Sequence, residues 1–157
     1  MKILVVSDSH GDKRSLVRAA RDTGPELILH LGDYDKDCAS LHDAVPNIPV
    51  RAVRGNGDWQ SHELGEDEFV IAGVRIFMTH GHWYGVKRGL DTVIDAAFCR
   101  NADILLFGHT HIPYYAKLRG ITILNPGSIG MGGKTYAVLT IENGIVSHEF
   151  ASVDGKN

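Results

Sequence analysis

Residues 103–111 read Asp-Ile-Leu-Leu-Phe-Gly-His-Thr-His. The apolar run Ile104–Phe107 has the length of a strand and lies between a charge and a glycine, which predicts a buried strand that ends in a loop. His109 and His111 would therefore stand just past the carboxyl end of a strand, where open α/β sheets place their chemistry. Their spacing lets both rings face one crevice if the backbone stays extended at Thr110. The alternative is a pair of solvated loop histidines, and the rest of the chain decides between the two.

Three earlier apolar runs end in the same way. Strands are predicted over residues 2–7, 26–31 and 50–54, and each is followed by polar residues with glycine neighbours. The segments that follow them are Asp8-Ser9-His10-Gly11, Gly32-Asp33 and Gly55-Asn56-Gly57-Asp58. Packing does not explain this repetition, because a core needs apolar residues and a turn needs only the glycines. The pattern favours a functional site assembled from several strand ends.

Helical patterns separate the early strands, whereas hairpin signals separate the late ones. Asp12 is a candidate N-cap for a helix over 13–21, residues 34–45 are weakly helical, and 90–99 is amphipathic. The remaining strands are expected at 68–71, 74–79, 114–118, 121–125, 135–141 and 145–151, with turns at Ala72-Gly73 and Asn143-Gly144. Helical connections imply parallel pairing and hairpins imply antiparallel pairing. We therefore expect an α/β fold in which two mixed β-sheets pack face to face with flanking helices outside.

The composition excludes several classes of protein. With 157 residues, 43% hydrophobic and 22% charged, the chain fits one globular domain. No apolar segment approaches the ~20 residues of a membrane span, and the N-terminal apolar run is too short for a signal peptide, so we expect a cytoplasmic protein with no membrane partner. Cys38 and Cys99 fall in helical patterns and are expected as reduced thiols. A net charge of −3, with 16 basic and 19 acidic residues interspersed, gives no strong nucleic-acid footprint.

The strand ends present eight oxygen and imidazole donors and no thiolate. Such donors suit Mn²⁺, Fe²⁺, Zn²⁺ or Ni²⁺, whereas a closed structural zinc site normally recruits cysteine. Eight donors are too many for one ion, but they suffice for two ions that share a carboxylate, an arrangement suited to displacement at phosphorus. The eight are Asp8, His10, Asp33, Asn56, His80, His82, His109 and His111.

The chain resembles the calcineurin-like metallophosphoesterases, and most closely their short YfcE-type phosphodiesterase branch. Five ordered motifs carry the resemblance: Asp8-x-His10, Gly32-Asp33, Gly55-Asn56-x-Asp58, His80 and Gly108-His109-x-His111. It runs from Lys2 to about Ile141 and implies a four-layer αββα sandwich, so that residues 1–157 form a single metallophosphoesterase domain. No pattern continues past Ala151, and the polar run that follows predicts a mobile tail at about 152–157.

The resemblance also implies a ligand set for two divalent metal ions. Mn²⁺ is the expected ion, with Ni²⁺, Fe²⁺ and Zn²⁺ as alternatives. The first ion would be held by Asp8, His10, Asp33 and His111. The second would be held by Asp33, Asn56, His80 and His109, so that Asp33 is the bridge.

Two residues are expected to have catalytic roles. Asn56 would act both as a ligand and in catalysis, although taken alone it is typical of a tight turn. Many family members carry a histidine where this chain has Gly57, and in them it lies near the leaving group as a candidate general acid; the short branch commonly lacks it. His82 is the nearest substitute by sequence, because it lies two residues past His80. Its alternative is a merely exposed or supporting histidine.

Two neighbouring residues are expected to support the site rather than react. Asp58 would orient His10 or another ligand by accepting a hydrogen bond from the ring N–H. Arg54 is expected to serve the structure rather than to bind phosphate.

These observations predict a dinuclear metal-dependent phosphodiesterase, in which a metal-bridging hydroxide attacks the phosphorus of a small phosphodiester. A metal-dependent phosphomonoesterase would keep the metals and change the substrate. A non-catalytic protein-interaction scaffold is the second alternative, since a retromer subunit shares this fold, but such a chain should have lost its metal ligands. The chain is short for a large recognition insert, which disfavours protein substrates, and a homo-oligomer is left open.

Overall fold

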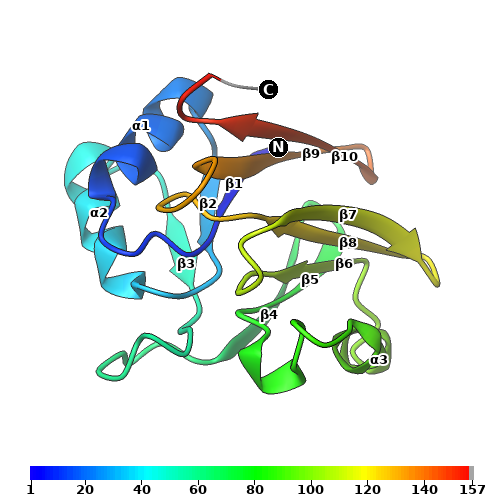
Figure 1. The fold of residues 1–157 in the computed structure, drawn as a ribbon. Coiled ribbons are helices and arrows are strands. Elements are labelled where there is room, and N and C mark those ends of the chain that lie inside the picture. Colours follow the sequence, from blue (N-terminus) through cyan, green and yellow to red (C-terminus); the bar gives the residue numbers. More distant parts are fainter. Residues whose placement is uncertain (156–157) are drawn as a thin grey trace.

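Two five-stranded β-sheets face each other in the computed structural model, which describes residues 1–155 (Figure 1). The strand orders are β10-β9-β1-β2-β3 and β4-β5-β6-β8-β7. The strands are β1 (Lys2–Val6), β2 (Leu27–His30), β3 (Val50–Ala52), β4 (Glu66–Ile71), β5 (Val74–Thr79), β6 (Ile104–Phe107), β7 (Pro113–Leu118), β8 (Ile121–Pro126), β9 (Thr135–Glu142) and β10 (Ile145–Ser152). The helices are α1 (Lys13–Thr23), α2 (Ala39–Ala44) and α3 (Asp91–Cys99), with short 3₁₀ turns η1 (Asp35–Cys38) and η2 (His82–Tyr84).

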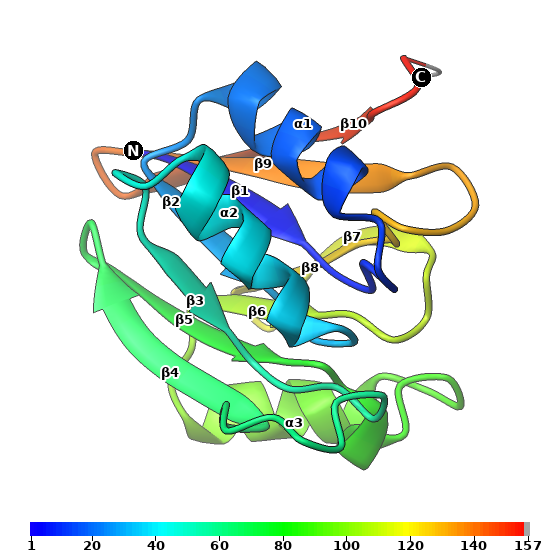
Figure 2. The ribbon, with the colours of Figure 1, turned by 90° about the vertical axis from the view of Figure 1, so that its left-hand side faces the viewer.

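Each sheet mixes parallel and antiparallel pairs, which confirms the predicted α/β class. Strands β1, β2 and β3 run parallel, as do β5, β6 and β8. The hairpins β4–β5, β7–β8 and β9–β10 are antiparallel. Helices α1 and α2 lie over the outer face of the first sheet and α3 lies on the far side of the second, so the molecule has four layers (Figures 1 and 2).

Side chains point to alternate faces along each strand, and this alternation produces three apolar layers. In β1, Ile3 and Val5 point between the sheets, while Leu4 and Val6 point toward α1. In the second sheet, Phe77 and Leu105 pack against α3. Successive side chains of a strand face opposite sides, so a strand buried on both faces must be apolar throughout. This explains why the first and middle strands read as unbroken hydrophobic runs.

Helix α1 begins where the sequence predicts. The Asp12 side chain accepts a hydrogen bond from the backbone N–H of Ser15 at 3.0 Å, a cap that typically contributes about 0.5–2 kcal/mol. The helix ends at Gly24, whose φ of 54° is left-handed, a conformation that glycine adopts without a Cβ penalty. The cap fixes the direction in which the chain leaves the segment that follows β1, and this segment carries Asp8 and His10.

The C-terminal segment differs from the expected tail. Ser152 is the last residue of β10, and the side chain of Val153 is buried against the layer beneath α1. The backbone N–H of Val153 donates to the carbonyl of Lys134 at 3.1 Å. The pairing of β10 with β9 therefore extends further than the polar sequence predicts. Residues 156 and 157 lie outside the described part of the chain.

Two further expectations concern cysteines and membranes. Cys38 is buried, Cys99 is exposed, and neither forms a disulfide, as expected. Within residues 1–155, no helix is both long and apolar enough to cross a membrane.

Candidate metal centre

The seven expected metal ligands lie at one edge of the molecule, where the carboxyl ends of five strands meet. Parallel register places the end of β1 beside that of β2, and the end of β5 beside that of β6. The loops that follow these strands and β3 carry the polar side chains. Six of the seven form two groups of three, and within each group the ligand atoms lie within 4.8 Å of one another. The first group is Asp8, His10 and His111, and the second group is Asp33, His80 and His109.

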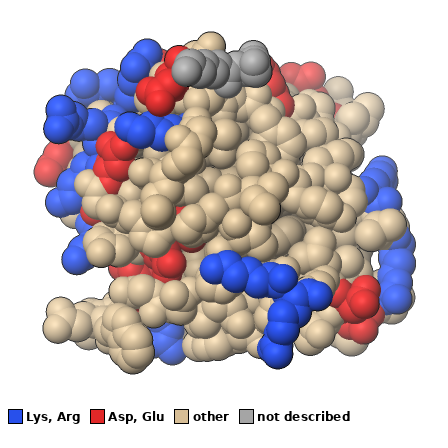
Figure 3. Space-filling view, in the orientation of Figure 1, with Lys and Arg blue, Asp and Glu red and all other residues tan. Residues whose placement is uncertain are grey.

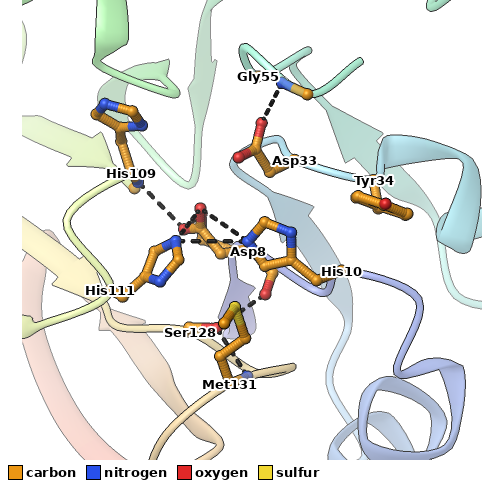
Figure 4. A network of polar contacts seen from close by, with 12 residues as sticks. Asp8, His10, Asp33, Tyr34, Gly55, His109, His111, Ser128 and Met131 are labelled. Atoms are coloured by element: carbon orange, nitrogen blue, oxygen red, sulfur yellow. Dashed lines mark hydrogen bonds and ion pairs between the residues drawn. The ribbon is translucent and has the colours of Figure 1, made fainter.

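Asp8 lies between the two histidines of the first group (Figure 4). Its Oδ1 atom is 3.1 Å from Nε2 of His111 and 4.0 Å from Nε2 of His10. Its Oδ2 atom accepts hydrogen bonds from the Ser7 hydroxyl at 2.5 Å and the His109 backbone N–H at 3.1 Å. Burial is the main cause that raises the pKa of Asp8, to about 7. Oδ1 is buried without a hydrogen bond among the described residues, which is costly unless a cation satisfies it.

The second group is held more deeply. His80 is fully buried, and its Nδ1–H donates to the carbonyl of Leu31 at 2.7 Å, which leaves Nε2 as a bare acceptor facing the site. That Nε2 atom lies 3.1 Å from Nδ1 of His109, 3.6 Å from Oδ1 of Asp33 and 3.2 Å from Oδ1 of Asn56. Burial lowers the pKa of His80 and of His109 to about 4, so both rings are neutral at pH 7. Neutral imidazole is the form that binds a metal ion.

The residues present fit divalent metal ions. A bare Nε2 and a carboxylate oxygen that approach within 4 Å bring lone pairs together, and a cation between them removes that repulsion. Oxygen and imidazole donors without thiolate match the borderline metals of hydrolytic sites. Asp8 Oδ1 also lies 3.9 Å from Nε2 of His80, so the two groups are neighbours rather than separate sites.

Backbone conformation assigns each histidine of the 109–111 pair to a different group. His109 and His111 have φ values of 66° and 61°. The backbone is therefore left-handed on both sides of Thr110, and the two rings enter neighbouring donor groups of the same site. Among the seven donors, Asp8, His10 and Asp33 also have left-handed φ values, of 55°, 45° and 59°. Such positions cost on the order of 1–3 kcal/mol each and persist only where the surroundings impose them.

Asp58 supports the site in a different way from the one expected. Its Oδ2 atom accepts from the backbone N–H groups of Asp33 at 2.9 Å and Gly55 at 2.7 Å, and its Oδ1 atom accepts from Tyr34 at 2.6 Å. Asp58 therefore supports a candidate ligand through the backbone N–H of Asp33, and not through the ring N–H of His10 or of another ligand as expected. The tight turns that follow β2 and β3 bring several backbone N–H groups together without partners in a sheet, and the Asp58 carboxylate accepts hydrogen bonds from them.

A buried polar chain under the first group was not predicted. The N–H of Gly32 donates to Nδ1 of His30 at 3.2 Å, so Nε2–H of His30 donates to the Ser9 hydroxyl at 3.1 Å. Ser9 in turn donates to Oδ2 of Asp37 at 2.8 Å, which also accepts from the N–H of Gly11. This chain fixes the segment that carries Asp8 and His10. The only signal in the sequence was a histidine inside the otherwise apolar β2.

The loop between β8 and β9 also supports the donors. The Asn125 side chain donates to the carbonyl of Gly108 at 2.9 Å and to the Thr110 hydroxyl at 3.0 Å. The Ser128 hydroxyl donates to the backbone carbonyl of Asp8 at 2.8 Å (Figure 4). Asn125 therefore holds the segment of His109 and His111, while Ser128 holds Asp8. Because the sequence pattern showed only a strand end and a loop here, these roles were missed.

His82 borders the second group without belonging to it. Its ring centroid is 5.4 Å from that of His80 and 6.1 Å from that of His109. Its Nδ1 atom is buried and accepts no hydrogen bond among the described residues. Gly57 packs against the Asp33 carboxylate, and its N–H donates to Oδ1 of Asp33 at 2.7 Å. His82 is therefore an imidazole that lies beside two of the candidate donors without being one of them.

Known proteins resemble this chain over nearly its whole length. The family model described as the calcineurin-like phosphoesterase superfamily domain matches residues 1–144. A probable metallophosphoesterase of Bacillus subtilis, YsnB, is 35% identical over 96% of this chain and 90% of its own. The phosphodiesterase YfcE of Escherichia coli is 25% identical over 94% and 90%. A crystal structure of a predicted phosphoesterase from Streptococcus pneumoniae superposes with a TM-score of 0.80 at 27% identity, over 99% of this chain and 91% of that one.

Proposed function

The chain belongs to the calcineurin-like phosphoesterase superfamily as a metal-dependent phosphoesterase, and we propose that it is a phosphodiesterase that uses two metal ions. The observation that carries the proposal is the pairing of two three-residue donor groups at one edge, with Asp8 Oδ1 beside histidines of both. One ion would leave half of these donors without a partner. The diester substrate is proposed from the likeness to the YfcE phosphodiesterase.

The two donor groups would hold one ion each. Asp8, His10 and His111 would hold the first ion, and Asp33, His80, His109 and Asn56 would hold the second, with Asp33 shared between them. When bound, the ions would supply an activated water and offset negative charge on the phosphoryl oxygens. Every donor is an oxygen or an imidazole nitrogen, which suits divalent metals of this kind. Mn²⁺ is the proposed ion, with Ni²⁺, Fe²⁺ and Zn²⁺ as alternatives.

The chain's own residues would position the substrate and move a proton. The Asn56 side chain is exposed, so its amide oxygen can face His80 and the second ion while its NH₂ donates to a phosphoryl oxygen. Burial lowers the pKa of His82, which leaves the free ring neutral at pH 7. A phosphate anion beside it would stabilise the protonated ring. His82 would then donate that proton to the leaving oxygen, since Gly57 has no side chain to do so.

The role of His82 is tested with diesters that share one substituent and differ in the pKa of the leaving alcohol. General acid catalysis typically contributes ~10²–10⁴-fold, and it matters most for a poor leaving group. His82→Ala should therefore steepen the fall in rate with leaving-group pKa, while metal content stays at the wild-type value. His62→Ala, which changes an exposed histidine outside both groups, is the matched control. Equal slopes for wild type and His82→Ala would remove His82 as the acid.

The substrate class and the alternatives are tested together. Protein purified with Mn²⁺ is assayed with bis(p-nitrophenyl) phosphate and p-nitrophenyl phosphate, which differ in ester number and share the leaving group. A higher kcat/KM for the diester supports the proposal, whereas faster hydrolysis of the monoester assigns a phosphomonoesterase. Absence of turnover with either ester, in protein that holds two ions, favours the non-catalytic scaffold.

A further inference from the structure

A hollow lies beside the loop that carries two of the candidate metal donors. It has a volume of about 540 Å³, within the ~300–1,000 Å³ that is usual for small-ligand sites. Its wall comes from the turn that leads into α3 and from the loop between β6 and β7, the loop that carries His109 and His111. Five of its lining side chains are apolar or aromatic: Val86, Leu90, Phe107, Ile112 and Tyr114. None of these residues is needed as a metal donor.

Two features connect the hollow to the donors. Thr110, which lies between His109 and His111 in the chain, lines it. Lys87, which is exposed, also lines it. The Lys87 ammonium therefore shares the hollow with the residue that lies between the two candidate donors. On the face shown in Figure 3, basic side chains lie across the lower centre of a largely uncharged surface.

The apolar lining is only partly open to solvent: Val86 and Phe107 are buried in the core, whereas the rim is accessible. Ile112 is 66% exposed directly after His111, and Tyr114 is half-buried at the start of β7. A large apolar side chain on a loop beside charged groups contributes little to folding, but it can bury the carbon atoms of a ligand. A phosphate bound at the metal donors would have this surface on one flank.

We propose that this hollow holds an aromatic or similarly flat apolar substituent of the phosphate substrate, with the Lys87 ammonium paired to the phosphate at the boundary between the hollow and the metal centre. The inference rests on the proposed function, because it places the phosphate at the two donor groups. The enzyme would then prefer phosphate esters of large flat groups over those of small alkyl groups. Burial of one face of such a ring removes apolar surface from water, at ~25 cal/mol per Å².

Phosphonates test the proposal, because their C–P bond has no leaving group and is not hydrolysed. Phenylphosphonate and methylphosphonate carry the same anion and differ only in the organic group. Their dissociation constants are measured by calorimetry on wild-type protein loaded with two ions. We expect phenylphosphonate to bind at least about tenfold more tightly, equivalent to ~1.4 kcal/mol. Equal affinities would overturn the proposal.

Matched variants locate the ring and the charge. Ile112→Ser should reduce the phenyl-to-methyl affinity ratio several-fold, whereas Ile145→Ser, at an isoleucine 72% exposed on the first sheet, should leave it unchanged. Lys87→Met should weaken both phosphonates about equally. Arg88→Met removes the next charge in the chain, which lines a different hollow with Asp91, and should weaken neither. If Ile112→Ser keeps the wild-type phenyl-to-methyl affinity ratio, the phenyl ring binds elsewhere, and the assignment of the hollow as its site is overturned.

The same experiments separate this inference from the proposed function. Phenyl preference in a protein that does not hydrolyse bis(p-nitrophenyl) phosphate would retain the hollow as a binding site and reject the phosphodiesterase. Diester hydrolysis by a protein that binds both phosphonates equally well would retain the phosphodiesterase and reject the hollow as a binding site. Failure to bind either phosphonate would reject both, because a metal-loaded site must bind the anion.

Discussion

The two donor groups differ in how firmly the fold holds them. In the second group, His80 is fully buried and hydrogen-bonded to Leu31, and Asp33 is 4% exposed. His109 alone is partly exposed there. In the first group Asp8 is buried, but the His10 and His111 side chains are 25% and 33% exposed. Their rings pack edge-on against each other, with ring centroids 5.2 Å apart. Donors that are fixed before an ion arrives lose less entropy on binding, so the second group should bind its ion more tightly.

The largest expected effect tests whether the two groups act together. If Asp33 is shared, Asp33→Asn should lower the metal content at both groups and reduce kcat by on the order of 10³-fold, because charge neutralisation at phosphorus is lost. Metal analysis and diester turnover measure this. Asp35→Asn removes a nearby carboxylate outside both groups and should retain two ions.

A variant Asp33→Asn that keeps two equivalents of metal and normal turnover would reject the bridge. The proximity of Asp8 Oδ1 to His80 and His111 gives a direct comparison. If Asp8→Asn instead loses both ions, the shared carboxylate is Asp8.

Metal removal should separate the two groups. A ligand bound only by the folded state stabilises it by ~2.7 kcal/mol at a hundred times Kd, so full chelation should lower Tm by several degrees. With increasing chelator, we expect the metal content to fall in two steps, and the first step should empty the group that contains His10.

His10→Ala should abolish the first step and leave the second. His80→Asn should remove the tight second step. A single step in wild type would show that the groups do not differ, and an unchanged Tm would contradict metal-dependent stability.

The smallest expected effect concerns the polar chain under the first group. Burial lowers the pKa of His30 to about 4 in the folded protein, against 6.5 in the unfolded chain. A lowered folded pKa contributes stability that is present above pH 6.5 and is lost as the pH falls from 6.5 to 4. In metal-free protein, the stability difference between wild type and His30→Gln should therefore shrink over this range, by on the order of 2 kcal/mol. Urea unfolding at each pH measures it.

The metal-free protein is needed for that comparison, because acid also displaces metal ions. Asp8 acts with the opposite sign: its pKa is raised by burial, so its contribution to stability is present at low pH and is lost as the pH rises through about 7. Both proteins in the comparison keep Asp8, so its effect cancels. If the stability difference between wild type and His30→Gln does not change with pH, then burial does not lower the pKa of His30 in the folded protein.

The sequence by itself was sufficient for the layers and for the choice of candidate donors. Buried parallel strands such as β1 and β6 read as unbroken apolar runs, and hairpins such as β9–β10 are signalled by Asn143-Gly144, because burial and turn geometry depend on neighbouring residues. Polar residues directly after an apolar strand then identify the edge where a site is built. Asp8 and His80 were predicted as donors on this local basis, together with the family resemblance.

The family resemblance already implied how the candidate donors divide into two groups, but only the tertiary structure decided how close they lie and what supports them. His10 and His111 lie 101 positions apart, yet their ring nitrogens are 3.4 Å apart. This contact depends on sheet packing and on left-handed φ values that no local pattern requires. The hydrogen bonds of Asp58 and His30, and the hollow beside Ile112, arise in the same way. Side-chain periodicity encodes which face of an element is buried, whereas the partner across a gap is set by the placement of other elements.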